Sequence, residues 1–334
     1  DPLVFDDAYS VDVYWLPFFE TNYVAMAMDS VFAYEGFAPD GARSLKANVA
    51  PAGSAMGAYT GGVLTSSGSR DLTDFNALTF YARSDSVITL NEVGFGNDNT
   101  GTSKYSAGRS NIPLNGDWAF VIVPIPAPAK LISERGLFLM AENLEPAYPN
   151  GYNIWFDEIR YAQLDNIEIF RANMPSVTQQ YFIGSTVSLD GTQTIFLIDG
   201  SYAPVSHSPN YFDFVSSDPA VAKVSNGEIK VVGPGTASVT ATVGPDSTMV
   251  NGAITVTGFL SPTEAAPTPT VPGADVISMF SGAYQDILVD TWRTDWSQSG
   301  AVEDYAVQGD NTKMYTSLIY AGIDFQTQMI DASE

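Results

Sequence analysis

A carboxylate occupies an unexpected place in the stretch YNIWFDEIRY, residues 152–161. The aromatic and β-branched residues predict a strand, and successive residues of a strand face opposite sides of a sheet. Asp157 then shares the more apolar face with Trp155 and Ile159. Burial disfavours an ionised carboxylate, so a carboxylate in that place needs a partner.

The first strand repeats this arrangement. In LVFDDAY, residues 3–9, alternation places Asp7 on one face with Leu3 and Phe5. Two carboxylates brought together in a partly buried place would repel each other. A hard cation such as calcium, which binds carboxylate and carbonyl oxygens, would relieve this repulsion. The alternative is that Asp7 and Asp157 lie at strand ends and point to water.

Residues for catalysis are sparse. One histidine and no cysteine give poor support for a Ser-His-Asp triad and exclude a thiol nucleophile or a zinc-thiolate site. GxSxG, HExxH and Gly-rich phosphate loops are absent. The 38 acidic residues leave the paired carboxylates of a glycosidase open, but no dense acidic motif indicates them. We expect no enzyme activity in this chain, while a catalytic domain beyond Glu334 stays open.

The charge balance is strongly acidic. The chain has 334 residues, with 14 Lys+Arg against 38 Asp+Glu and a net charge of −24. Nucleic acid and anionic membrane surfaces are therefore poor partners. The acidic surface suits either salty surroundings or an ordinary acidic secreted protein. No apolar stretch has the length of a transmembrane segment.

Short strands dominate the pattern. Runs such as ALTFYAR (77–83) and WAFVIVPIP (118–126) alternate with Gly, Asn and Pro clusters, and no long segment has helical periodicity. The chain is therefore predicted to be all-β and multi-domain. A Pro/Thr-rich segment at 260–274 predicts an extended linker. A change of composition near residue 170 predicts domains at 1–170, 171–259 and 275–334.

The second domain carries a specific pattern. SSDPAVAKVSNGEIKVVGPGTASVTATV, residues 216–243, has a tight GPG turn and strict alternation in its last strand. It resembles bacterial Ig-like domains of group 2. The resemblance implies an Ig-like β-sandwich that acts as a spacer. His207, in APVSHSPNYF, is then expected to be structural.

The first domain also carries a resemblance. Four segments follow one another in an order similar to that of jelly-roll carbohydrate-binding modules of bacterial glycanases and surface glycan-binding proteins. They are GARSLKANV (41–49), RDLTDFNALTFYAR (70–83), DWAFVIVPI (117–125) and YNIWFDEIRY (152–161). In a jelly roll the first and last strands commonly lie side by side, so the resemblance implies that the strand of Asp7 lies beside the strand of Asp157. Such modules often hold a structural calcium. The implied ligands here are Asp7 or Asp6, the loop at Asp40–Arg43, and Asp157.

The third domain resembles the start of the first. VFDDAYSVDVYW (4–15) and MFSGAYQDILVDTW (279–292) both carry F-x-x-A-Y followed by tryptophan. Residues 275–334 are therefore predicted to be the N-terminal part of a second jelly-roll-like module, in a native chain that continues past Glu334. A short C-terminal β extension is the alternative.

Aromatic residues suggest a place for a ligand, because proteins bind sugars by stacking aromatic rings on their C–H faces. VYWLPFFETNY, residues 13–23, is crowded with aromatics, and the sequence places Trp118 and Trp155 in the core. The alternative for the 13–23 cluster is a hydrophobic plug under a loop. The predicted ligand-binding residues are Tyr14, Trp15 and Phe19, with Asn97, Asn99 and Tyr105 of GNDNTGTSKY (96–105) as their complement.

These resemblances imply non-catalytic binding of an extracellular polysaccharide, at the bacterial surface or outside the cell. The acidic chain favours a neutral glycan, such as a β-glucan. Other cell-surface glycan-uptake proteins are further expected partners. Three alternatives stay open: a structural or adhesive surface protein without sugar binding, the accessory region of a larger polysaccharide-degrading enzyme, and a catalytic jelly roll such as a polysaccharide lyase.

Overall fold

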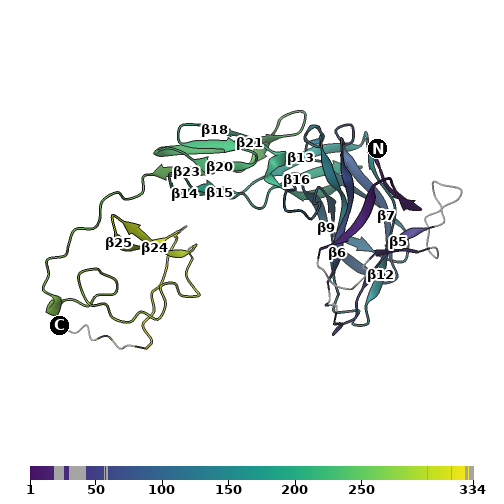
Figure 1. Ribbon diagram of the computed structural model, residues 1–334. Helices are drawn as coiled ribbons and strands as arrows, with labels where there is room; N and C mark the ends of the chain where they lie inside the picture. The colour runs from purple at the N-terminus through teal and green to yellow at the C-terminus, as the bar shows by residue number, and fades with distance from the viewer. Residues whose placement is uncertain are drawn as a thin grey trace.

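The computed structural model confirms an all-β, multi-domain chain (Figure 1). It describes residues 1–18, 26–29 (backbone), 43–55, 57, 59–298, 300–316, 318–327 and 330. Strands and three short 3-10 turns make up the regular structure of these residues. None of the described helical turns is long and apolar enough to cross a membrane.

One layer of the first sandwich, sheet one, has the order β10-β7-β12-β1-β2, with β5 beside β12 and β4 beside β5. Its strands are β1 (Leu3–Asp6), β2 (Ala8–Tyr9), β4 (Met26–Asp29), β5 (Ser44–Val49), β7 (Ala77–Ser84), β10 (Ala119–Pro124) and β12 (Tyr152–Ala162). β1 and β12 pair antiparallel. The first strand and the strand that carries Asp157 thus lie side by side, as the sequence predicted.

The opposing layer, sheet two, begins β3-β6-β11-β8-β9. These strands are β3 (Val13–Pro17), β6 (Tyr59–Arg70), β8 (Ile88–Phe95), β9 (Ala107–Leu114) and β11 (Glu134–Asn143). The 3-10 turn η1 (Pro128–Lys130) lies between β10 and β11 in the chain. Every pairing among these strands is antiparallel.

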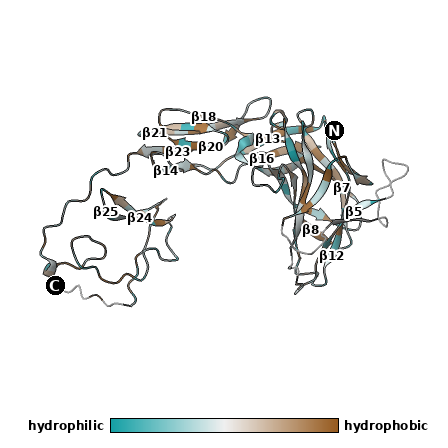
Figure 2. Ribbon diagram, in the orientation of Figure 1, coloured by the Kyte–Doolittle hydropathy of each residue, from teal (hydrophilic) through white to brown (hydrophobic). Residues whose placement is uncertain are grey.

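Alternate residues of the two sheets fill one hydrophobic core. The ring of Phe80 on sheet one lies 5.3 Å from that of Phe138 on sheet two, measured between centroids, and Phe156 packs against both. Figure 2 shows hydrophobic stretches along the strands of this sandwich. Burying a large apolar side chain contributes roughly 1.5–3 kcal/mol, so this core is the main stabilising feature of the first sandwich.

Sheet two continues past residue 170, where the sequence placed the end of the first domain. β9 pairs with β17 (Ser201–His207), β17 with β16 (Gln193–Ile198), and β16 with β13 (Ile167–Asn173). Phe196 of β16 and Tyr211 of the turn η2 (Pro209–Tyr211) belong to the core of the first sandwich. The predicted boundary thus lies inside β13, and the hairpin that follows it packs on the first sandwich.

A smaller sandwich follows, within the segment where the sequence predicted the Ig-like spacer. Val187, Ile229 and Val239 come from its two layers and share one core cluster. One layer has β14 (Val177–Phe182), β18 (Asp213–Ser216), β21 (Gly235–Val243), β22 (Thr248–Asn251) and β23 (Ile254–Phe259), and the other has β15 (Thr186–Val187), β19 (Ala222–Ser225) and β20 (Glu228–Val231).

The C-terminal part has little regular structure among its described residues. After β23, residues 260–272 form no strand, and the turn η3 (Gly273–Asp275) follows. The hairpin β24 (Val302–Val307) with β25 (Asp310–Tyr315) is the sheet found there. Trp296 is 63% exposed and Ile319 is 75% exposed. Apolar surface is thus left open in this part.

Candidate functional site

One edge of β12 pairs with two different strands, and Asp157 lies between the two paired stretches. β5 pairs with β12 from Tyr152 to Phe156, whereas β1 pairs with it at Ile159 and Arg160. The pairing with β7 on the other edge shifts register between Asp157 and Arg160, which marks a bulge. Glu158 adopts φ +52° in this bulge, a left-handed conformation that is uncommon outside glycine.

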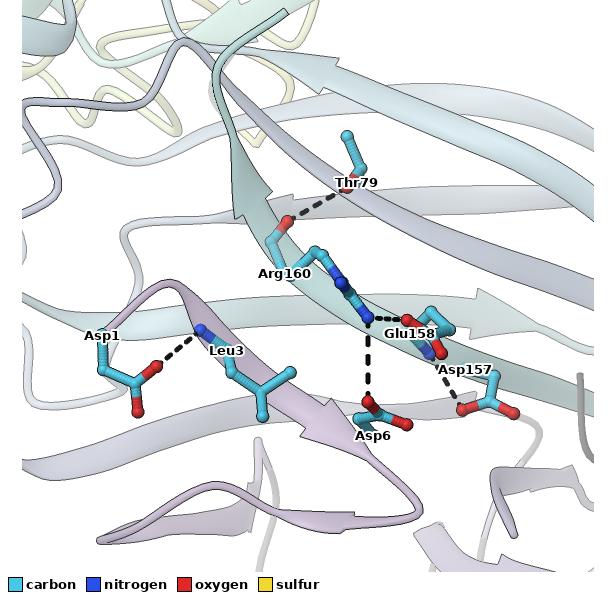
Figure 3. Close-up of polar contacts among 7 residues, drawn as sticks. All are labelled: Asp1, Leu3, Asp6, Thr79, Asp157, Glu158 and Arg160. Carbon is cyan, nitrogen blue, oxygen red and sulfur yellow. Dashed lines mark hydrogen bonds and ion pairs between the residues drawn. The ribbon is translucent and has the colours of Figure 1, made fainter. Parts of the chain in front are cut away.

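Asp157 does not point to water, because it is only 2% exposed. Its Oδ1 accepts a hydrogen bond of 2.9 Å from the backbone N–H of Glu158. The Glu158 carboxylate is paired with the Arg160 guanidinium, which also lies 3.7 Å from Asp6 (Figure 3). The bulge therefore places two carboxylates, Glu158 and Asp6, beside one arginine, while Asp157 is held by the backbone.

The predicted calcium site can be compared with the oxygens of this region. Oδ1 of Asp7 accepts a 2.7 Å hydrogen bond from the backbone N–H of Arg43. Ser44 follows Arg43 and, extending the β5–β12 register by one residue, lies level with Asp157. The Ser44 hydroxyl is buried and has no hydrogen-bond partner. An orphaned hydroxyl near two carboxylates is the kind of oxygen set that a hard cation prefers.

Of the two candidate carboxylates in the first strand, Asp7 fits this site better, because Asp6 faces Arg160. Asp40 lies outside the described residues. Among the residues that are described, no group of three or more acidic or histidine side chains is placed to hold a metal. Calcium therefore stays a prediction, and its remaining ligands would come from residues 40–42.

The outer face of sheet one carries aromatic and charged residues in register. The core side of β7 is formed by Leu78, Phe80 and Ala82, so Tyr81 and Arg83 project to the outer face. Tyr81 lies opposite Phe120 of β10 on one side and opposite Asp157 of β12 on the other. These residues form a row that crosses three strands.

A hollow of 200 Å³ opens beside this row. Its walls include Tyr81, Phe120, Thr79 and the ion-paired Glu158 and Arg160. The Tyr81 and Phe120 rings lie 5.0 Å apart at an angle of 44°, and Phe120 is 51% exposed. The hollow thus places the exposed ring of Phe120 and the partly exposed ring of Tyr81 next to a carboxylate and a guanidinium.

A second row on the same face contains two tryptophans. The Arg83 guanidinium lies 5.9 Å from the Trp118 ring centre and 5.7 Å from that of Trp155, and the Lys46 ammonium lies 5.4 Å from Trp155. Trp155 is 3% exposed, yet its neighbours Ile154 and Phe156 are the ones that enter the sandwich core. Trp155 is therefore buried, as predicted, but on the outer face of sheet one and outside the main core cluster, whereas Trp118 is only partly buried.

The predicted aromatic platform lies on β3, at the edge of sheet two. Tyr14 is 42% exposed, as a stacking residue requires. Trp15 instead packs against the core, and its ring approaches Gly62 so closely that a Cβ added there would lie 2.5 Å from it. Trp15 is thus ill placed to receive a sugar. Phe19 lies outside the described residues.

The polar complement predicted from the loop at 96–105 does reach β3. The Asn99 side-chain amide donates to the carbonyl of Pro17 at 3.3 Å, and the Asn97 side chain accepts from the backbone N–H of Asn99 at 2.8 Å. Tyr105 packs partly against the core, edge-on to Tyr211. The structure therefore joins the two predicted segments, but both asparagines serve the loop and Tyr105 offers little open ring face.

The residues of sheet one that line the hollow were not among the predicted site residues. Tyr81 and Phe120 lie within the apolar runs 77–83 and 118–126, where an aromatic residue indicates a strand whichever face of the sheet it occupies. The available signal was the register of polar and charged residues, Arg83 and Arg160, that share this face with them.

Comparison with known proteins identifies remote structural neighbours. No protein-family model and no curated protein matches the chain. The chain is similar to the family 30 carbohydrate-binding module of a Clostridium thermocellum cellulosomal cellulase, at 16% identity, TM-score 0.35, and coverage of 49% of this chain and 98% of that one. It is also similar to a family 11 carbohydrate-binding module of the same organism, solved with a β-1,3-1,4-mixed-linked tetrasaccharide, at 10% identity, TM-score 0.32, and coverage of 48% and 95%.

A third neighbour is a β-1,2-glucanase from Parabacteroides distasonis, at 13% identity and TM-score 0.29, where 76% of this chain corresponds to 36% of that chain. All three TM-scores lie below 0.5. These similarities are therefore too remote to indicate a ligand for this chain.

Proposed function

We propose that the chain binds an extracellular polysaccharide without cleaving it, through the outer face of sheet one. The observation that carries this proposal is the Tyr81–Phe120 pair, half-open to solvent, beside the Glu158–Arg160 ion pair. The C–H face of a sugar ring can stack on the aromatic rings. The neighbouring carboxylate and guanidinium can accept from and donate to its hydroxyls.

The extended form of the face suits a polymer better than a single small molecule. The Tyr81 row runs across β10, β7 and β12, and the partly exposed Trp118 lies next to it on this face, so a glycan chain could contact more than one ring. The hollow itself is shallow and smaller than a typical small-molecule pocket. Contact with successive sugar units would then supply the affinity.

A neutral polysaccharide is the expected ligand class. The net charge of −24 repels uronic-acid and sulfated polymers, although salt weakens this repulsion. We propose a β-glucan as the first polymer to test, in an extracellular or cell-surface setting. Calcium, if bound beside Asp7 and Asp157, would stabilise the fold and take no part in chemistry.

Affinity electrophoresis tests the proposal. The intact chain should migrate more slowly in gels that contain a neutral β-glucan such as laminarin than in plain gels. Phe120→Ala removes an exposed ring and should weaken binding by about tenfold or more, because a few aromatic anchors carry most of the affinity of such surfaces. Its unfolding temperature should stay close to that of the unmodified chain.

Phe170→Ala is the matched control. Phe170 is 52% exposed and lies 4.7 Å from Tyr202, so it repeats the exposure and pairing of Phe120 away from sheet one. This variant should be retarded like the unmodified chain. Equal retardation of Phe120→Ala and Phe170→Ala would remove the support for the site, and absence of retardation by a panel of neutral glycans would favour the structural or adhesive alternative.

A further inference from the structure

A second pocket, larger than the hollow on sheet one, lies in a different part of the first sandwich. It has a volume of 420 Å³, within the range of small-molecule sites. The loop at 96–105, the turn η1 and the start of β11 form its walls. None of the residues of the sheet-one hollow lines it.

A buried carboxyl group faces this pocket. Glu134 lines the wall and is 8% exposed, and among the described residues its carboxyl has no hydrogen bond or ion pair. Burial, followed by the negative charge of Asp98, raises the pKa of Glu134 to about 7. A carboxyl that lines an open pocket without a protein partner is available to pair with a ligand that fills the pocket.

Asp98 completes the acidic side of the pocket. Its Oδ1 accepts from the Thr100 backbone N–H at 3.2 Å and from the Thr100 and Ser103 hydroxyls at 2.7 Å. Although burial opposes the change, these hydrogen bonds lower the pKa of Asp98. The pocket thus combines an ionised carboxylate with a carboxyl that still carries its proton in mildly acidic solution.

Hydrogen-bond donors share the walls with these acids. Lys104 and Arg135 line the pocket, and Nε of Arg135 donates to the Ser66 carbonyl at 3.0 Å. Lys130 also reaches it, but its ammonium is held by Asp213 at 2.9 Å and by the carbonyl of Asn210 at 2.9 Å. Because donors and acceptors are interspersed, the pocket suits a ligand that is rich in hydroxyl groups, each of which can both donate and accept.

The pocket is also held in shape by its surroundings. The carbonyl of Lys104 accepts from the side chains of Ser208 and Asn210, and the carbonyl of Tyr105 accepts from the Tyr211 hydroxyl at 2.8 Å. Asn99 fixes the other end of the loop to β3. A loop pinned at both ends loses little further entropy when a ligand binds, which favours recognition of a small ligand.

We infer that this pocket binds a single hexopyranose unit, with the Glu134 carboxyl and Asp98 as its acceptors and Lys104 and Arg135 as its donors. The choice of a sugar rests on the proposed function, whereas the need for a hydroxyl-rich ligand rests on the pocket alone. The pocket would hold a chain end or a side branch by hydrogen bonds, while sheet one stacks against the length of the polymer.

Saturation-transfer NMR on the intact chain tests the inference with methyl glucoside, methyl galactoside and methyl mannoside as probes. At least one should receive saturation. Glu134→Leu should weaken binding by about tenfold or more, since it leaves sugar hydroxyls against an apolar group. Glu134→Gln keeps a donor and an acceptor in the same shape and should retain binding. Thr102→Trp, an exposed change at the wall, should block the pocket even if Glu134→Leu fails to fold.

Phe120→Ala separates this inference from the proposed function, because saturation of the methyl glycosides that remains in this variant does not come from stacking on Phe120. Signal lost in Phe120→Ala but kept in Glu134→Leu or Thr102→Trp would place all sugar binding on sheet one and overturn the pocket. Absence of saturation with all three probes would overturn it as well. Retardation by a polysaccharide in the gel would still stand in either case.

Discussion

His207 illustrates how burial sets the chemistry of one residue. It is 9% exposed, and its ring nitrogens lie 2.9 Å from the Thr194 hydroxyl and 2.9 Å from the Ser208 carbonyl. The carbonyl accepts from Nδ1–H, so the hydroxyl donates to Nε2 of a neutral ring. Burial lowers the pKa of His207 to about 4. The sequence was thus right to treat this histidine as structural.

The pH dependence of His207 follows from this. In the unfolded chain the ring takes up a proton near its ordinary pKa of 6.5, whereas the folded ring stays neutral down to about 4. The free energy of unfolding should therefore fall as pH drops through this interval, because the unfolded state then binds more protons. NMR of the single histidine should give a midpoint near 4. A midpoint near 6.5 in the folded protein would contradict the buried, neutral ring.

The predicted calcium site lies beside β1 and β5, the two strands that pair with the same edge of β12. Chelation should lower the unfolding temperature of the unmodified chain, since the carboxylates of Asp7 and Asp157 would then repel each other without compensation. Asp157→Asn removes one charge and should reduce that response. Elemental analysis of the purified protein should find calcium. A protein without bound metal and without a thermal response to chelator would show that hydrogen bonds alone hold Asp157.

The β16–β17 hairpin extends the first sandwich past residue 170, so the stability of fragments can test where this domain ends. It pairs with β9, and Phe196, Val205 and the adjacent Tyr211 belong to the core of the first sandwich. A fragment ending at residue 170 would lose these side chains and expose the β9 edge, so it should unfold at a lower temperature or aggregate. A fragment ending at residue 259 should unfold cooperatively. Equal thermal stability of the two fragments would mean that the hairpin is dispensable.

For the whole molecule, the sequence predicted the all-β class because short alternating strands and frequent turns are local signals. It also predicted that the first strand lies beside the strand of Asp157, which the structure confirms. The strands of the second sandwich from residue 216 onward were predicted for the same reason, since the alternation is strict in TASVTATV, residues 236–243.

What the sequence missed depends on contacts between distant segments. Nothing local shows that β17 pairs with β9, which lies about 100 residues earlier. Trp15 and Trp155 look alike as strand tryptophans, yet sheet pairing puts Trp15 against the core and Trp155 on the outer face. The carboxyl of Glu134 meets the loop of Asp98 only in the folded chain. Site residues were therefore harder to predict than the fold class.

Footprinting of side chains is the most direct test of whether the outer face of sheet one binds polysaccharide. Carbene labelling of the intact chain, with and without laminarin or another glycan that retards it in the gel, reports which side chains the polymer covers. We expect protection of Tyr81, Phe120 and Trp118, with Tyr14 and Phe170 labelled equally in both samples. Protection of Tyr14 without Phe120, or no protection by any retarding glycan, would contradict the account.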